Sequence, residues 1–406
     1  MDVCFSSCAG FDVHRNTVVA CIITPRGQAT RTFGTFTADL EALAAWLEAE
    51  GVTPVAMEAT GVYWKPVYNV LETVSSLTLW VVNAQHIKRV PGRKTDVQDA
   101  QWLADLLRHG LVHPSFIPDR AQRELRDPVR LRKPLTGART DAINRIHKTL
   151  EASNLTLSQG ASDILGASGR RVLQALIDGE TDPTRLADAT TGRLQASPEQ
   201  LAAALRGHLT PVLRHLLETH FALVTTYDRT IAGLDRQIAA ALGVHADLLN
   251  RLTTIPGVGH KTAELLLAEA GTDRRRFPTA HHFTSWAGFA PGQRESGGKR
   301  HAARTRKGNR WLRAGFTETG RSAGRTQETA LAVIYQRIKG RRGPNRAAIA
   351  VGRHQLLAAY DIIRDGTPYQ EPDPPVRTHH DNQRRLRHHV RQLEALGYRV
   401  NVEPVA

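Results

Sequence analysis

"CAGFDVHRNTVVACIITPRGQATRTFGTF" (Cys8–Phe36) decides the fold of the N-terminal part of this 406-residue chain. β-Branched and apolar residues alternate with polar ones in three short runs, and the residues "PRGQ" separate the second run from the third. Such runs, joined by tight turns, are typical of consecutive β-strands. The stretch therefore predicts a three-stranded meander with Asp12 in its first strand.

After the meander, helical and strand patterns alternate. The face of the next predicted helix carries four apolar residues, Leu40, Leu43, Ala44 and Leu47. "TPVAMEAT" (53–60) then reads as a short apolar strand that ends at Glu58, followed by a helix over 61–74 and a buried strand over 77–83. This order predicts a mixed sheet with helices on its faces. It is the strand order of a ribonuclease-H-like domain, although other α/β folds share the pattern.

The stretch "GRKTDVQDAQWLADLL" (Gly92–Leu107) starts a helix with two aspartates, Asp96 and Asp99, three residues apart. One explanation is helix capping: Thr95 and Gln98 match a capping box, and acids in a first turn suit the helix dipole. The other explanation is a metal site, because side chains three residues apart on a helix are neighbours. The stretch alone leaves both explanations open.

A metal site gains support from two acids upstream of this helix, Asp12 and Glu58. Four carboxylates brought together could not all stay ionised without cations. Mg²⁺ is the natural counter-charge because it is a hard, oxygen-binding cation. Two such ions about 3.5–4 Å apart can stabilise both the attacking and the leaving oxygen of a phosphoryl transfer. Each acid by itself is an ordinary solvated carboxylate.

Charge is unevenly distributed along the chain, which has a net charge of +15 and a pI near 10.3. Residues 1–118 contain nine Lys and Arg against eleven Asp and Glu, whereas residues 291–345 contain fourteen against three. A strongly basic segment indicates a polyanionic partner, most commonly a nucleic acid. The asymmetry predicts an acidic domain for chemistry and a basic domain that holds nucleic acid.

The three cysteines, Cys4, Cys8 and Cys21, lie in the first strands and are too few for a disulfide framework. We expect them to be buried, reduced thiols. The first ten residues, "MDVCFSSCAG", lack the basic and apolar regions of a signal peptide. No apolar run approaches the length of about 20 residues that spans a membrane. A cytoplasmic protein is therefore expected.

The middle of the chain is predicted to be helical. Residues 119–158 form a basic helical stretch in which Pro128 and Pro134 are expected to break or kink the helix. Residues 163–200 resemble a small polar helical insert with Gly and Pro breaks.

A long helix is predicted from Pro211 to Leu242, with Thr210 as its N-cap. Its apolar positions alternate in steps of three and four, as in a coiled-coil seam: Val224, Tyr227, Ile231, Leu234, Ile238 and Ala241. Packing inside a bundle and self-association explain this seam equally well.

"RLTTIPGVGHKTAELLLAEAG" (Arg251–Gly271) reads as a helix, a glycine hairpin and a second helix. Backbone N–H groups at such a helix N-terminus can bind a phosphate. An ordinary turn between core helices is the alternative.

Ser296 lies in "RESGGKR", followed by a basic run. A nucleophilic serine needs neighbouring cations that stabilise developing charge, whereas a flexible Ser/Gly loop is the alternative explanation. The candidate nucleic-acid contacts are Arg93, Lys94, Gly257, Gly259, Lys261, Lys299, Arg300, Arg304, Arg306, Lys307 and Arg310.

Five motifs carry a resemblance to a known family. They are "GFDVHRNTVVA", "AMEATGVYWKPV", "GRKTDVQDAQWLADLL", "IPGVGHKTAELLLAE" and "FTSWAGFAPGQRESGGKRHAARTRKGNRWLR". In this order they resemble the DEDD transposases of bacterial insertion sequences, the insertion-sequence one-ten family, which includes the Piv-type DNA invertases. The resemblance implies a RuvC-like, ribonuclease-H-like domain, a coiled-coil region and a C-terminal domain with a catalytic serine.

Carried onto this sequence, the resemblance assigns the acidic, Mg²⁺-binding tetrad to Asp12, Glu58, Asp96 and Asp99. It assigns the covalent nucleophile to Ser296. It also implies a dimer or tetramer with a composite site, and a structured bridge RNA that selects the DNA. The function expected is that of a transposase, a Mg²⁺-dependent DNA recombinase. The alternatives are a RuvC-like structure-specific endonuclease that cuts with water, and a catalytically inactive, nucleic-acid-binding transposase remnant.

The expected fold class is α/β plus α: an N-terminal ribonuclease-H-like mixed sheet with helices, a long-helix coiled-coil region and a mainly helical C-terminal domain. Four segments are predicted. They are a catalytic domain over 1–118, a helical linker and coiled-coil region over 119–250, a C-terminal transposase domain over 251–368 and a basic tail over 369–406.

Overall fold

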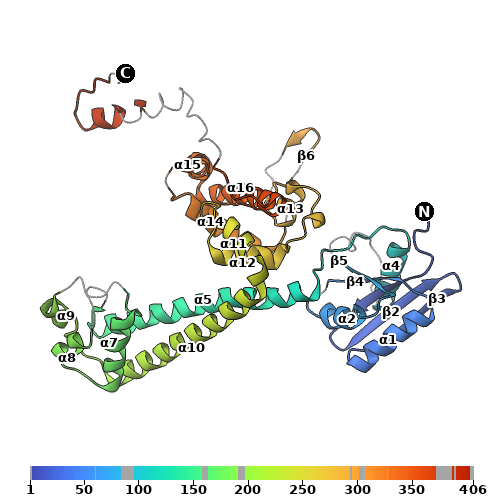
Figure 1. The fold of residues 1–406 in the computed structure, drawn as a ribbon, viewed down its shortest axis with the longest axis horizontal. Helices are drawn as coiled ribbons and strands as arrows, with labels where there is room; N and C mark the ends of the chain where they lie inside the picture. Colours follow the sequence, from blue (N-terminus) through green and yellow to red (C-terminus); the bar gives the residue numbers. More distant parts are fainter. Residues whose placement is uncertain are drawn as a thin grey trace. The chain divides into compact units, whose positions relative to one another are not determined.

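The chain divides into two compact units, Met1–Asp119 and Arg120–Ala406, which are described separately (Figure 1). In this computed structural model the described residues are 2–59, 61–83, 96–157, 163–190, 197–292, 295–300, 305, 307–326, 328–371, 386–387 and 390–402. The proposed helix cap Thr95 lies outside them.

The first unit is built on a five-stranded mixed sheet in the order β3-β2-β1-β4-β5. The first three strands form the predicted antiparallel meander, and the last two run parallel to β1. The strand bounds are Cys8–Val13 (β1), Thr17–Thr24 (β2), Gly27–Gly34 (β3), Pro54–Glu58 (β4) and Thr78–Val82 (β5). The ribonuclease-H-like strand order expected from the sequence is confirmed.

Helices cover both faces of this sheet (Figure 1). On one face, α1 (Thr37–Ala49) and α2 (Trp64–Leu71) enclose a core that contains the four predicted apolar residues of α1. On the other face, α4 (Asp96–Arg108) packs on alternate residues of β1, β2 and β4. Alternate strand residues point to opposite faces, so the two cores share strands but no side chains.

Gly10 in β1 allows α4 to approach the sheet at backbone distance. A Cβ atom at this position would overlap the backbone of Ala100 and Ala104. Backbone atoms cannot swing aside as a flexible side chain does, so α4 can lie this close only on a glycine.

We therefore expect Gly10→Ala to lower the free energy of unfolding of the first unit by about 1–3 kcal/mol, through overpacking. Thermal unfolding checks this. Gly34→Ala is the matched control, because its nearest neighbour is the flexible Asp39 side chain. An equal, small effect of both variants would show that α4 is free to move away from the sheet.

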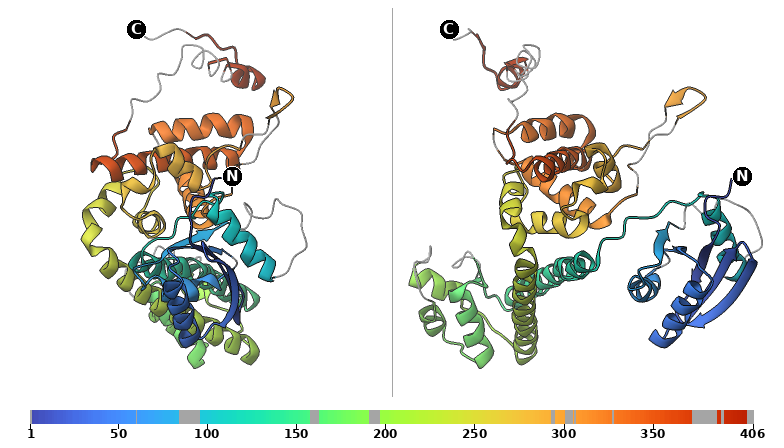
Figure 2. Two further views of the ribbon diagram at one scale, coloured as in Figure 1. Left: turned by 90° about the vertical axis from the view of Figure 1, so that its right-hand side faces the viewer. Right: turned by 45° about the vertical axis from the view of Figure 1, so that its right-hand side comes forward.

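Two long helices, α5 (Arg120–Ala152) and α10 (Pro211–Leu242), lie side by side and antiparallel in the second unit (Figures 1 and 2). Arg132 pairs with Asp235 at 2.8 Å. Arg139, about two helical turns further along α5, binds Asp228. The helix predicted over 211–242 is confirmed, with Thr210 accepting a hydrogen bond from the amide of Leu213.

The coiled-coil seam of α10 is partly covered by this intrachain pair. Val224 and Ile238 are fully buried, Tyr227 and Leu234 are half-buried, and Ala241 is exposed. Packing within the chain therefore accounts for much of the seam. Self-association remains a separate proposal.

The sequence predicts that Pro128 and Pro134 break or kink the helix. The predicted break is wrong, because α5 continues through both prolines; a kink stays a prediction. Long-range contacts of the same stretch explain this. Val129 and Arg132 are buried, and Arg130 and Arg132 bind carboxylates of a neighbouring helix. These contacts outweigh the local cost of a proline, which is about 3 kcal/mol in a helix interior.

That cost should be recovered by removing an exposed proline. We expect Pro134→Ala to raise the free energy of unfolding of the second unit by about 1–3 kcal/mol. Gly137→Ala calibrates the measurement, since its added Cβ meets no atom within 4 Å and a gain of about 1 kcal/mol is expected from helix propensity. A fall in melting temperature for Pro134→Ala would mean that α5 requires a bend at this position.

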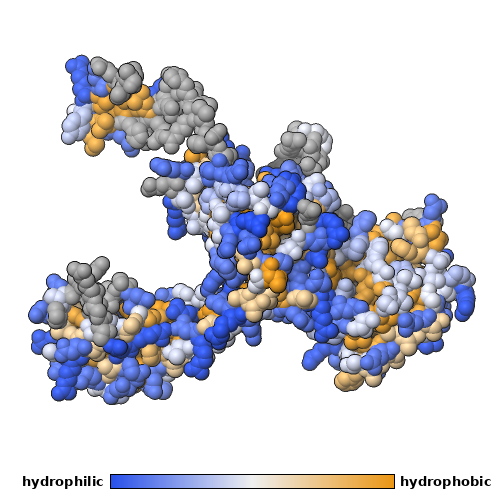
Figure 3. Space-filling view, in the orientation of Figure 1, coloured by the Kyte–Doolittle hydropathy of each residue, from blue (hydrophilic) through white to orange (hydrophobic). Residues whose placement is uncertain are grey.

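Three short helices cover one end of the α5–α10 pair. They form the small polar helical insert that the sequence predicts over residues 163–200. They are α7 (Ala167–Asp178), α8 (Pro183–Asp188) and α9 (Pro198–Ala204). Their apolar residues share one core with the ends of α5 and α10. Hydrophilic residues cover most of this lobe in the space-filling view (Figure 3).

The rest of the second unit is a mainly helical core, as expected from the sequence. Phe283, Phe289 and Phe316 are buried at its centre, together with one face of the last long helix. The elements are η1 (Gly243–His245), α11 (Ala246–Leu252), α12 (His260–Ala270), η2 (Arg274–Arg276), α13 (Ala280–Trp286), β6 (Glu295–Ser296), β7 (Lys299–Arg300), α14 (Arg310–Ala323), α15 (Ala330–Arg342) and α16 (Pro344–Asp365).

Cys8 and Cys21 are buried free thiols, as predicted, and burial raises the pKa of Cys8 to about 11. Cys4 is exposed, so the expectation of burial is wrong for this residue. It precedes β1, outside the sheet that encloses the other two. Among the described residues, none of the helices is both long enough and apolar enough to span a membrane.

Candidate functional site

The parallel strands β1 and β4 place Asp12 and Glu58 at the same edge of the sheet. Phe11 pairs with Met57, and each acid is the next residue of its strand. Strand residues alternate between faces, so both acids belong to the face that packs on α4. Two acids that are 46 positions apart in the sequence therefore become neighbours because the strands are parallel and in register.

α4 crosses this face so that its first turn lies near Asp12. The Cys8 thiol donates to the carbonyl of Ala104 at 3.5 Å, and Gly10 lies under Ala100 and Ala104. From Gly10 to Asp12, β1 advances by about 6.6 Å. From Ala100 back to Asp96, α4 covers a similar distance, about 6 Å. Asp96 therefore lies beside Asp12, as Ala100 lies beside Gly10.

His14 completes the cluster. Its Nε2 lies 3.1 Å from Oδ2 of Asp12 and 3.4 Å from Oδ2 of Asp96. One ligand atom from each of these three residues lies within 4.8 Å of the other two. Sequence reasoning missed His14. The available signal was its position two residues after Asp12, which puts both side chains on one face of an extended chain.

Asp12 is the most buried member of the cluster, with 18% of its side chain exposed. Burial raises the pKa of its carboxyl group; His14 opposes this, and the charges of Asp96 and Asp99 add to it. Two carboxylates and an imidazole at this spacing fit a divalent cation, which would relieve the repulsion between the acids.

Asp99 and Glu58 stand beside the three clustered residues. Asp99 is exposed on the first turn of α4, and its charge acts on Asp12. Glu58 is half-buried at the end of β4. The structure thus brings Asp12 and Asp96 together and sets the other two predicted acids next to them.

Ser296 lies in the second unit, in a two-stranded hairpin formed by β6 and β7. Gly297 and Gly298 make its turn with φ of 57° and 74°, a conformation in which glycine is preferred. Ser296 pairs with Lys299 across the hairpin. The backbone therefore sets the serine directly opposite a basic residue.

The helix hairpin before α12 has a structural explanation for one of its glycines. Gly257 has a φ of 84°, and a Cβ there would lie 2.6 Å from the carbonyl oxygen of Thr319 in α14. Gly259, the N-cap of α12, is exposed with open space around it. Lys261 is also mainly exposed and lies 3.6 Å from Asp235.

The predicted basic contacts differ in how far the structure describes them. Lys307 and Arg310 are exposed, and the guanidinium of Arg310 lies 4.9 Å from the ring centroid of Trp311. Lys299 and Arg300 are placed by the backbone of β7. Four further candidates lie outside the described residues: Arg93, Lys94, Arg304 and Arg306.

Comparison with known proteins places two parts of the chain in one family. Residues 9–154, which hold all four predicted acids, match the IS110-type DEDD transposase family. Residues 249–336, which include Ser296, match the transposase IS116/IS110/IS902 family. The chain belongs to this family of insertion-sequence transposases. It is therefore a transposase- or recombinase-type enzyme that acts on DNA, and DEDD transposases generally use a divalent metal.

Three relatives illustrate the family. An uncharacterized 43.6 kDa protein of insertion element IS110 from Streptomyces coelicolor is 29% identical over 70% of this chain and 74% of its own length. The transposase for insertion sequence IS1111A of Coxiella burnetii is 25% identical, covering 71% and 72%. A pilin gene-inverting protein of Moraxella lacunata is 23% identical, covering 89% of this chain and 97% of its own.

Proposed function

We propose that this transposase exchanges DNA strands by covalent catalysis, with Ser296 as the nucleophile and a Mg²⁺-binding acidic site as its partner. The observation that carries the proposal is the cluster of Asp12, His14 and Asp96, with Glu58 on the adjacent strand. Acids gathered at one edge of a ribonuclease-H-like sheet are suited to holding the cations of a phosphoryl-transfer reaction.

In this proposal Asp12, Glu58, Asp96 and Asp99 hold the metal. Bound Mg²⁺ would stabilise negative charge on the phosphate oxygens during transfer. Carboxylates repel a DNA phosphate, so the role of these residues would be to fix the position of the cation that binds it. His14 lies within reach of the same cation and, through its hydrogen bond to Asp12, would also orient that carboxylate.

Ser296 would attack a DNA phosphorus atom through its Oγ. An Oγ–P bond forms as the bond from phosphorus to one deoxyribose oxygen breaks; the serine hydroxyl loses its proton and the released deoxyribose oxygen gains one. The hydroxyl of a second strand then attacks the same phosphorus, which breaks the Oγ–P bond, and a proton returns to the serine. The turn glycines and the facing Lys299 support this role. A cation beside the phosphate stabilises the charge that develops on its oxygens.

The basic residues after Ser296 would bind the phosphates of DNA and of a structured guide RNA. Their charge, concentrated in residues 291–345, supports a polyanionic ligand. Such binding should fall steeply with salt. The glycine hairpin at Gly257 and Gly259, with Lys261, is the proposed second phosphate contact, and the exposed Gly259 is its more accessible part.

A homo-oligomer, dimer or tetramer with a composite site, is proposed from the family to which the chain belongs and from the coiled-coil seam of α10. The acids of one subunit would then meet the serine of another. The proposed segments are the catalytic domain 1–118, the linker and coiled coil 119–250, the serine-bearing domain 251–368 and the basic tail 369–406.

Excision from a plasmid that carries the ends of the insertion sequence tests the proposal. With its guide RNA, the purified protein should release the element in Mg²⁺ and do nothing in EDTA. Cutting that leaves hydrolysed ends and no rejoined DNA would favour a RuvC-like endonuclease. Nucleic-acid binding without any cutting would favour an inactive remnant.

A further inference from the structure

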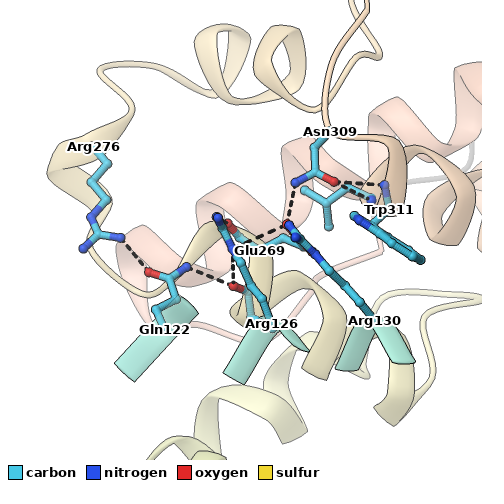
Figure 4. A network of polar contacts seen from close by, with 9 residues as sticks. Gln122, Arg126, Arg130, Glu269, Arg276, Asn309 and Trp311 are labelled. Carbon is cyan, nitrogen blue, oxygen red and sulfur yellow. Dashed lines mark hydrogen bonds and ion pairs between the residues drawn. The ribbon is translucent and has the colours of Figure 1, made fainter. Parts of the chain in front are cut away.

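Glu269, near the end of α12, is a fully buried carboxylate with no exposed side-chain surface. Its oxygens accept hydrogen bonds from Arg130 at 2.6 and 2.8 Å and from Asn309 Nδ2 at 2.6 Å (Figure 4). Arg126 lies 3.5 Å away. A buried charge must be paired and hydrogen-bonded, and all these contacts are made across three different elements.

On one side, the network attaches the start of α5 to the end of α12. Arg126 donates to the carbonyls of Ala268 and Glu269, and Gln122 also donates to Ala268 (Figure 4). These carbonyls belong to a helix C-terminus, where no intrahelical donor remains. Burial lowers the pKa of Arg126 to about 10, although the charge of Glu269 opposes this.

On the other side, the network reaches the residue that starts α14. The side-chain oxygen of Asn309 accepts from the amides of Trp311 and Leu312, which caps the helix. Its Nδ2 is thereby left to bind Glu269 (Figure 4). One amide side chain therefore both begins α14 and fastens that point to α12.

Asn309 also closes the segment that carries Ser296. The backbone N–H of Asn309 donates to the carbonyl of Trp286 at 3.1 Å. Next to it, a Cβ at Gly308 would overlap the backbone of Gly288, and Arg313 donates to the carbonyl of Gly288 at 2.7 Å. Residues 308–309 therefore lie against residues 286–288, just before Phe289, whose ring is still buried in the core.

We propose that Glu269 is a positioning residue for the serine segment: through Asn309 it fixes the base from which the Ser296 hairpin extends. The inference rests on the proposed function, in which Ser296 is the nucleophile. Small displacements of a nucleophile are expensive, since a misplacement of about 1 Å can cost a hundredfold in rate.

Docking of α5 on α12 does not by itself explain Glu269, because a second buried pair joins the same two helices. Arg132 binds Glu264 at 2.5 Å, and each side chain is only 6% exposed. Glu264 also accepts a hydrogen bond from His260, and in the part of the chain that the structure describes its side chain bonds to Arg132 and His260 but not to residues of the serine segment. What distinguishes Glu269 from Glu264 is the contact with Asn309.

The test compares Glu269→Gln and Asn309→Ser with the matched control Glu264→Gln. Serine can still cap α14 but is too short to donate to Glu269. We expect both test variants to form the covalent DNA adduct about ten- to a hundredfold more slowly, with DNA affinity within about twofold of wild type. Glu264→Gln should lose comparable thermal stability and keep its rate within about twofold.

Amide hydrogen exchange provides a second readout that does not depend on catalysis. The backbone amides of residues 307–313 should exchange faster in Asn309→Ser than in Glu264→Gln. Each variant is measured the same number of degrees below its own melting temperature. Equal rates and equal exchange in the two variants would overturn the positioning role, as would a wild-type adduct rate in Asn309→Ser. If Ser296→Ala still forms the adduct, the proposed function fails, while the exchange comparison still decides whether Glu269 fixes this base.

Discussion

Replacing Ser296 with alanine should abolish covalent attachment of the protein to cleaved DNA, with a loss of at least about a thousandfold. The alanine variant lacks the oxygen that would bond to phosphorus. The turn at Gly297 and Gly298 does not depend on the serine hydroxyl, so the hairpin should still form. Adducts trapped on a nicked substrate and resolved on a denaturing gel would measure the effect.

Ser322→Ala is the matched control, because Ser322 is an exposed serine of α14 in the same unit. It should form adducts at the wild-type rate. DNA binding should be equal in both variants and in the parent protein. Adducts that persist in Ser296→Ala would remove this residue from the chemistry.

Replacing Asp12 with asparagine should slow strand cleavage by about a hundredfold or more. It should also remove the stabilisation that added divalent metal gives to the first unit. Asparagine keeps the size of the side chain but lacks the charge. Without metal, this variant should be more stable than the parent near neutral pH. The gain follows from the raised pKa of Asp12, whose main cause is burial.

The sign follows from proton linkage. A carboxyl group with a raised pKa binds its proton more tightly in the folded state, so stability falls as pH rises from 3.8, its ordinary value, through the raised value. Asparagine removes that loss. Asp105→Asn, on α4 but paired with His109, is the control and should keep both activity and the metal effect. A metal-dependent rise in melting temperature that survives in Asp12→Asn would place the metal elsewhere.

Local pattern predicts much of the fold of this chain. The alternation in β1 to β3 and the apolar face of α1 depend on residues close together in sequence, and both are found as predicted. The prolines of α5 show the limit of local reasoning. Arg130 and Arg132 bind carboxylates more than 130 positions away, and such contacts leave no local signal.

The candidate site shows the same division. Asp12 is recognisable as an acid within a predicted strand, and Glu58 and Asp96 as acids at the ends of predicted elements. Their proximity requires the parallel register of β1 with β4 and the close approach of α4 over Gly10. Strand periodicity could have predicted His14, because it lies two residues after Asp12 and on the same face of the strand. The roles proposed for Glu269 and Asn309 depend on packing between helices far apart in the sequence.

The most direct test of the central claim is to identify the residue that carries DNA after cleavage. Trapped adducts would be digested with nuclease and trypsin, and the peptide that retains a nucleotide would be sequenced by mass spectrometry. The nucleotide is expected on Ser296, in the tryptic peptide Glu295–Lys299. A nucleotide on any other residue, or cleaved DNA with no attached peptide, would contradict covalent catalysis by this serine.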